Sequence, residues 1–151
     1  MSQEKSQESA TPQKTPQKTP QATSIDGAPR GALTVRIIAM PADTNANGDI
    51  FGGWVLSRMD QAGGIAGVER ARGRVVTVAI DAMQFIRPVR VGDVLEVYTE
   101  VESIGRTSMQ IHVEAWAQRF QTHVREQVTQ AMFKFVAIDD AGKPRPIPKE
   151  V

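Results

Sequence analysis

The chain has 151 residues, and 18 Lys and Arg against 17 Asp and Glu give a formal net charge of +1. A charge so close to zero provides no global field for nucleic acid or an anionic membrane. The chain has no cysteine, which excludes thiol nucleophiles, disulfides and thiolate zinc sites. No apolar run reaches the roughly 20 residues that cross a bilayer, and the N-terminus lacks a secretory signal. We therefore expect a cytoplasmic protein that binds neither nucleic acid nor membrane.

Residues 1–30 are predicted to form a disordered, low-complexity tail. They are rich in Gln, Ser, Thr, Pro and Lys, and they contain the repeat TPQKTPQKTPQ from Thr11. Such a segment buries too little apolar surface to offset the entropy lost on ordering. Residues 31–148 are long enough for a single domain, and residues 149–151 form a C-terminal tail.

The first half of the predicted domain contains a strand, a loop and a helix. LTVRIIAM, from Leu33, predicts a short strand that Pro41 ends. PADTNANGD then concentrates residues that favour turns. IFGGWVLSRMDQAGGIAGVERAR predicts a helix that ends near Gly73, with Asp49 placed to cap it. Five glycines weaken this helix in isolation, so we expect a buried helix whose glycines allow close packing: Gly52, Gly53, Gly63, Gly64 and Gly67.

From Arg74 onward the apolar residues follow the two-residue period of strands. RVVTVAIDAMQFI is apolar on both faces, which predicts a strand covered on two sides. DVLEVYTEVESI and SMQIHVEAWAQ each have one apolar and one polar face, and VTQAMFKFVAID is a fourth candidate. One helix with five strands joined by tight turns predicts an α+β domain whose antiparallel sheet curls around the helix. The two-sided strand favours side-by-side pairing of two subunits.

Asp49 is the leading candidate for chemistry, because it lies where the loop meets the predicted helix. A carboxylate there either caps the helix or activates water or attacks a substrate directly. Gly52 and Gly53 would let a ligand approach the helix amides without a Cβ in the way. Residue type alone leaves both roles open.

Asp81 interrupts the apolar strand VTVAIDAMQF, where an unpaired buried carboxylate would be unfavourable. It is either a paired structural acid or a site residue that faces Asp49 of a second subunit. His112 and His123 are expected at the surface, and they lack metal-ligand spacing, so no metal is predicted. Arg87, Arg90 and Arg106 are ordinary solvated charges or, with nearby hydroxyls, anchors for a phosphate-bearing ligand.

Three blocks of the sequence resemble one known family. They are PADTNANGDIFGGWVLSRMDQAGGIAG, GRVVTVAIDAMQFIRPVRVGD and GRTSMQIHVEAW, in this order. Together they resemble the YciA-like acyl-CoA thioesterases of the hotdog superfamily, over roughly residues 33–148. The resemblance implies a hotdog fold, in which a five-stranded antiparallel sheet wraps a long helix, a dimer with two active sites at its interface, and often a trimer of such dimers.

The same resemblance implies roles for individual residues. Asp49 corresponds to the catalytic acid, and the amides of Gly52 and Gly53 would polarise the thioester carbonyl. Asp81 would contribute from the partner subunit. The candidates for contacts with the substrate and its coenzyme A portion are Asn45, Arg87, Pro88, Gly105, Arg106, Thr107 and Ser108. No cofactor is expected, since coenzyme A is part of the substrate and the product.

Two other functions compete with acyl-CoA hydrolysis. Dehydratases and hydratases of the same fold pair a histidine near the helix with an acid, but this chain has no histidine before His112. A non-catalytic acyl-CoA sensor would bind the same ligand without turnover. Such a sensor normally carries a DNA-binding module, and residues 1–30 show neither a helical pattern nor a basic block.

Overall fold

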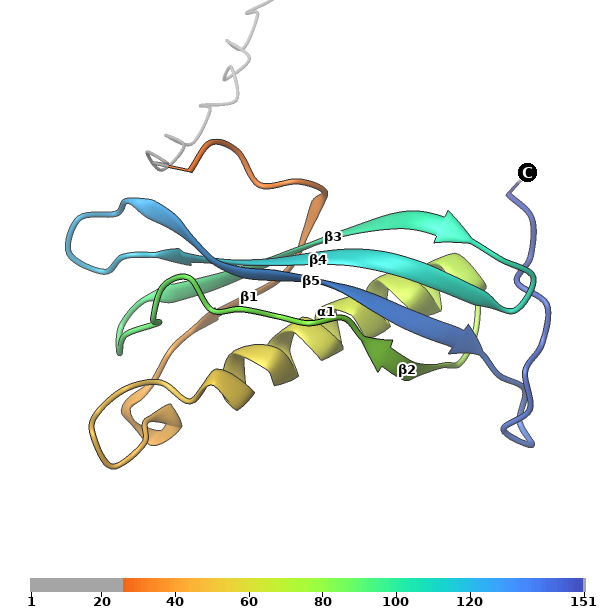
Figure 1. Cartoon of the computed structure of the whole chain (residues 1–151), viewed down its shortest axis with the longest axis horizontal. Coiled ribbons are helices and arrows are strands. Elements are labelled where there is room, and N and C mark those ends of the chain that lie inside the picture. The colour runs from red at the N-terminus through yellow and green to blue at the C-terminus, as the bar shows by residue number, and fades with distance from the viewer. Residues whose placement is uncertain (1–25, 151) are drawn as a thin grey trace, which may run out of the picture.

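The computed structural model of the chain describes residues 26–150. Its elements are β1 (Ala32–Ile38), the short 3₁₀ helix η1 (Pro41–Asp43), α1 (Gly52–Ala71), β2 (Val75–Ile80), β3 (Val94–Ile104), β4 (Ser108–Gln118) and β5 (Arg125–Ala137). The five strands form one antiparallel sheet in the order β1-β3-β4-β5-β2 (Figure 1). The predicted α+β hotdog architecture, five antiparallel strands around one long helix, is confirmed.

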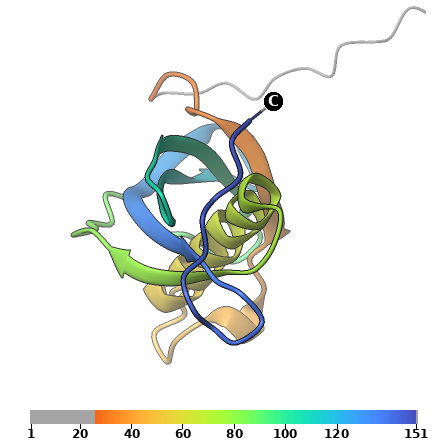
Figure 2. The same ribbon diagram turned by 90° about the vertical axis from the view of Figure 1, so that its right-hand side faces the viewer.

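The core lies between α1 and the concave face of the sheet, which curls around the helix (Figure 2). The predicted inward-facing set of β4 is buried, and it consists of Met109, Ile111, Val113 and Ala115. Helix and sheet approach closely at Gly63, where a Cβ would lie 2.8 Å from the ring of Phe135. A larger residue at position 63 would force the two layers apart.

The helix glycines differ from one another more than the sequence predicts. Gly67 is packed against Val75 and Gly52 against Phe85, so both match the expected close approach. Gly53 and Gly64 have nothing within 4 Å of a built Cβ, so the expectation of close packing is wrong for these two. Both positions face open space in the single chain because no neighbouring element covers them.

The second strand differs from its prediction in length and in cover. β2 ends at Ile80, and the chain then follows the edge of β5 without regular strand structure. Because β2 pairs only with β5, it is an edge strand. The side chains of Val76, Val78 and Ile80 are 42%, 51% and 39% exposed. The prediction that this strand is covered on two sides is therefore wrong for the single chain.

The convex face of the sheet is less exposed than its polar residues predict. His112 and Glu114 on β4 are 9% and 6% exposed, so the predicted surface position of His112 is wrong. The segment 26–31 crosses this face before β1 begins (Figure 1). Its Arg30 donates its backbone N–H to Glu114 at 3.0 Å. His123, in the β4–β5 turn, is exposed as predicted.

The predicted tail is only partly within the described residues. Residues 26–30 contact the domain, five residues earlier than the predicted boundary, whereas the repeat that begins at Thr11 lies outside the described residues. Division of the chain at residues 30 and 148 thus stays a prediction. No helix within residues 26–150 has the length and apolar character needed to cross a membrane.

Candidate active site

The loop before α1 holds Asp49 through its own backbone. Thr44 and Ile50 form an isolated β-bridge that closes the loop, and Gly48 has a left-handed φ of 82°. Asn45 donates its N–H to the carbonyl of Asp49 at 2.7 Å, and its side-chain oxygen accepts the N–H of Asp49 at 3.2 Å. Asn45 therefore fixes the backbone of the residue that was predicted to be catalytic.

The N-terminus of α1 is not capped by a side chain. Phe51 is the N-cap residue and forms no side-chain cap hydrogen bond. Asp49 lies two residues before it, so the prediction that Asp49 caps the helix is wrong. The amides of Gly52 and Gly53 consequently keep unpaired N–H groups and partial positive charge, whereas the N–H of Trp54 donates to the carbonyl of Phe51 at 3.1 Å. Gly53 leaves open space beside them, so a small anionic group has room there.

An apolar pocket opens beside this uncapped helix end. Its volume is about 370 Å³, and its walls include Ile50, Gly52, Val55, Phe85, Val89 and Val128. Val55, Val89 and Val128 are each at most 3% exposed. The pocket therefore combines an apolar floor with the amides of the helix start, and Asp49 directly precedes one of its wall residues. Apolar pockets with a few oriented polar groups are typical of small-molecule sites.

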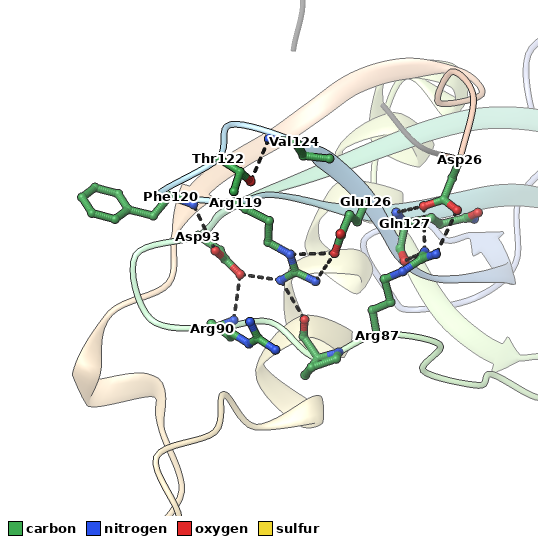
Figure 3. Close-up of polar contacts among 11 residues, drawn as sticks. Asp26, Arg87, Arg90, Asp93, Arg119, Phe120, Thr122, Val124, Glu126 and Gln127 are labelled. Carbon is green, nitrogen blue, oxygen red and sulfur yellow. Dashed lines mark hydrogen bonds and ion pairs between the residues drawn. The ribbon is translucent and has the colours of Figure 1, made fainter. Parts of the chain in front are cut away.

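Arg87 in the pocket wall is already paired in the single chain. Its guanidinium binds both carboxylate oxygens of Asp26, at 2.7 and 3.0 Å, and donates to the carbonyl of Gln127 at 3.0 Å. Asp26 also accepts the N–H of Gln127 at 2.9 Å (Figure 3). Sequence reasoning missed Asp26 because it lies in the segment predicted to be a disordered tail.

A second arginine, Arg119, binds the pocket wall at Pro88, next to Arg87. Arg119 donates to the carbonyl of Pro88 at 2.9 Å and to the Asp93 carboxylate at 2.6 Å (Figure 3). It also binds Glu126 at 2.8 Å. Burial lowers the pKa of Arg119, but the hydrogen bonds to Glu126 and Asp93 outweigh this effect, and its pKa is raised. The pocket wall is therefore fixed by charge-assisted hydrogen bonds on both sides.

Asp81 lies just after β2 and is exposed in the single chain. Its backbone N–H donates to the carbonyl of Met132 at 3.0 Å, whereas its carboxylate has no partner among residues 26–150. The interpretation of Asp81 as a buried, paired acid is wrong for the single chain, because β2 is an edge strand. A contribution from Asp81 to a site shared with a second subunit stays a prediction.

The residues 105–108 lie far from Asp49 along the molecule. They comprise the β3–β4 turn and the first residue of β4, and they lie near the C-terminal end of α1 (Figure 1). Arg106 accepts the N–H of Ile147 on its carbonyl at 2.8 Å, and Thr107 accepts the N–H of Ala137 at 2.8 Å. α1 has 20 residues and is thus about 30 Å long. One subunit therefore does not bring Arg106 and Asp49 to the same ligand atom.

The side chains within residues 26–150 form no cluster of three or more His, Cys, Asp or Glu that would suit a metal ion.

Comparisons with known proteins agree on one family. The family model of the thioesterase superfamily matches residues 47–121. The acyl-CoA thioester hydrolase YciA of Salmonella typhimurium is 50% identical over 129 residues, which cover 83% of this chain and 97% of that protein. YciA of Escherichia coli K12 is also 50% identical, over 81% of this chain and 95% of the relative.

Solved structures extend the comparison to three dimensions. The hexameric thioesterase y2039 from Yersinia pestis matches with a TM-score of 0.79 and 50% identity, over 82% of this chain and 100% of that one. HI0827, a hexameric broad-specificity acyl-coenzyme A thioesterase, matches with a TM-score of 0.80 and 48% identity, over 85% of this chain and 89% of that one.

Proposed function

This chain belongs to the YciA-like acyl-CoA thioester hydrolases of the thioesterase superfamily, and from that premise we propose that Asp49 hydrolyses the thioester at the N-terminus of α1. The observation that carries this proposal is the absence of a side-chain cap on α1. If Asp49 capped α1, its carboxylate would accept hydrogen bonds from the helix amides. Because it does not, the carboxylate and the amides both stay available to a substrate.

The proposed reaction converts an acyl-CoA and water into a carboxylic acid and coenzyme A. The amides of Gly52 and Gly53 polarise the thioester carbonyl and stabilise the negative oxygen that forms on it. Asp49 either removes a proton from the attacking water or attacks the carbonyl carbon itself, which gives an anhydride that water then hydrolyses. In both routes the C–S bond breaks and the thiolate of coenzyme A leaves and takes up a proton.

We propose that the active site is completed by a second subunit. The exposed apolar side chains of β2, from Val76 to Ile80, lie on an open sheet edge. An apolar edge of this kind favours pairing with another strand. Antiparallel pairing of two β2 strands around a two-fold axis would join the two sheets and cover these side chains.

Such a dimer would also place the α1 helices of the two subunits in opposite directions. A two-fold axis across β2 reverses the direction of the partner helix, so the C-terminal end of one α1 lies toward the N-terminal end of the other. The β3–β4 turn with Arg106, Thr107 and Ser108 would then approach Asp49 of the partner. This arrangement supports the proposed coenzyme A contacts of residues 105–108, with Arg106 meeting a phosphate.

Assembly beyond the dimer is proposed from the relatives. Both y2039 and HI0827 are described as hexameric, and a trimer of dimers is one closed symmetric way to build six subunits. The coenzyme A contacts of Asn45, Arg87 and Pro88, the shared role of Asp81, and the cytoplasmic location all stay predictions.

A dehydratase or hydratase is disfavoured by the position of His112. That histidine lies on the convex face of the sheet, where its Nε2 is 3.2 Å from the Oε1 of Gln130. The helix α1 packs against the opposite, concave face. His123 lies in the exposed β4–β5 turn. The described residues therefore offer no histidine beside the N-terminus of α1.

Release of free thiol from a series of acyl-CoAs tests the proposed function directly. Binding of coenzyme A is measured in parallel by calorimetry. A hydrolase releases thiol from several acyl-CoAs with multiple turnovers. Tight binding of acyl-CoA without thiol release would instead identify a sensor and overturn the proposal.

A further inference from the structure

We infer that the pocket beside α1 discriminates against acyl chains that end in a carboxylate, and that Asp26 sets this selectivity by neutralising Arg87. This inference rests on the proposed function, because it names a class of acyl group that the same site rejects. It also gives a role to a residue that precedes the predicted domain. Asp26 acts through Arg87 and is therefore a positioning residue.

The lining of the pocket carries the first part of the inference. Among the described residues that line it, Arg87 is the only one with an ionisable side chain. The floor is apolar and buried, since Val55, Val89 and Val128 are 2%, 3% and 0% exposed. Such a floor favours methylene groups and offers no hydrogen-bond partner to a polar chain end.

The geometry of Arg87 carries the second part. Asp26 meets the guanidinium with both carboxylate oxygens, at 2.7 and 3.0 Å. The two side chains are 30% and 22% exposed, so solvent screens the pair only in part. Gln127 fixes both partners at once, since its carbonyl accepts from Arg87 and its N–H donates to Asp26. The positive charge of Arg87 is thus balanced in place (Figure 3).

The position of Asp26 is fixed by the segment that follows it. Arg30 donates its N–H to Glu114 at 3.0 Å, which anchors the segment on the convex face. At Gly31, where φ is +94°, a Cβ would collide with the carbonyl oxygen of Thr99. Only glycine allows this approach without strain. The segment therefore enters β1 along one defined path, and Asp26 is held over Arg87.

The consequence for substrate choice follows from charge. An unpaired guanidinium in the wall would attract an acyl chain that ends in a carboxylate, through a charge-assisted bidentate contact. With Asp26 in place, the guanidinium fork is occupied, and the Asp26 carboxylate repels a second negative charge. The wild-type pocket consequently discriminates against carboxylate-ended acyl chains.

The test compares two acyl-CoAs of equal chain length, one ending in a methyl group and one ending in a carboxylate. The full-length chain is assayed as wild type, Asp26→Asn, and Asp26→Asn with Arg87→Gln. Asp140→Asn is the matched control, because it removes the same charge from an exposed turn at the other end of the molecule. The readout is the ratio of kcat/KM for the two substrates, which does not depend on the fraction of active enzyme.

Asp26→Asn is expected to raise the relative kcat/KM for the carboxylate-ended substrate by about tenfold, and adding Arg87→Gln is expected to abolish this gain. Asp140→Asn is expected to leave the ratio at its wild-type value. An unchanged ratio in Asp26→Asn, with wild-type turnover intact, would overturn this inference alone. Absence of thiol release from both substrates in the wild type would overturn the proposed function and this inference with it.

Discussion

The two ends of α1 are built in opposite ways. At the C-terminal end, Arg72 adopts a left-handed φ of 51°, and Arg145 donates to the carbonyl of Ala71 at 3.0 Å. At the N-terminal end no side chain caps the helix. One end therefore has its carbonyl groups satisfied by the protein, and the other keeps its amides for a ligand. The contrast indicates that the C-terminal end contributes stability and binding, and the N-terminal end contributes chemistry.

Apart from the loss of the Asp49 carboxylate, the largest effect is expected from charge reversal near the C-terminal end. Arg106→Glu should raise KM for acyl-CoA roughly 10- to 100-fold, because a charge-assisted contact with phosphate is replaced by repulsion. The value of kcat should stay near that of the wild type, because this end takes no part in the bond-breaking step. Lys143→Glu, an exposed charge reversal, is the control. A fall in kcat with unchanged KM would contradict the division of roles.

Arg145→Gln should lower stability and spare catalysis. It removes charge-assisted hydrogen bonds from Arg145 to the carbonyls of Ala71 and Ile138, which are 3.0 and 3.1 Å long. Each such bond contributes about 1.5–3 kcal/mol, reduced here by partial exposure. Urea unfolding should show a loss of about 1.5 kcal/mol in total. If stability is unchanged, these contacts do not secure the end of the helix.

The smallest change in the free energy of unfolding is expected for Gly53→Ala. Replacing glycine in a helix stabilises it by up to about 1 kcal/mol, and the new Cβ meets no neighbour within 4 Å. The methyl group would nevertheless crowd a thioester at the first-turn amides, and kcat/KM should fall roughly tenfold. Thermal unfolding and thiol release measured on one preparation would show the two opposite effects. Unchanged activity would mean that the substrate does not approach position 53.

The fold follows from the sequence because the alternating patterns of β3, β4 and β5 give each strand one apolar face. These faces are buried by packing against the glycine-rich helix. The same local patterns misassign residues whose surroundings come from distant segments. His112 looks exposed within its strand, but residues 26–31 cover that face. Asp49 has the residue type of a cap, but the turn at Phe51 places it outside the helix. Asp26 has no local signal, since its contacts with Arg87 and Gln127 join residues far apart in the sequence.

The most direct test of the central claim is the activity of Asp49→Asn. The asparagine retains the shape of the side chain and removes its negative charge, so unfolding temperature and coenzyme A affinity should match those of the wild type. Loss of a general base or nucleophile should lower kcat for acyl-CoA hydrolysis by about 10²- to 10⁴-fold. Hydrolysis by a folded Asp49→Asn enzyme at close to the wild-type rate would contradict the account.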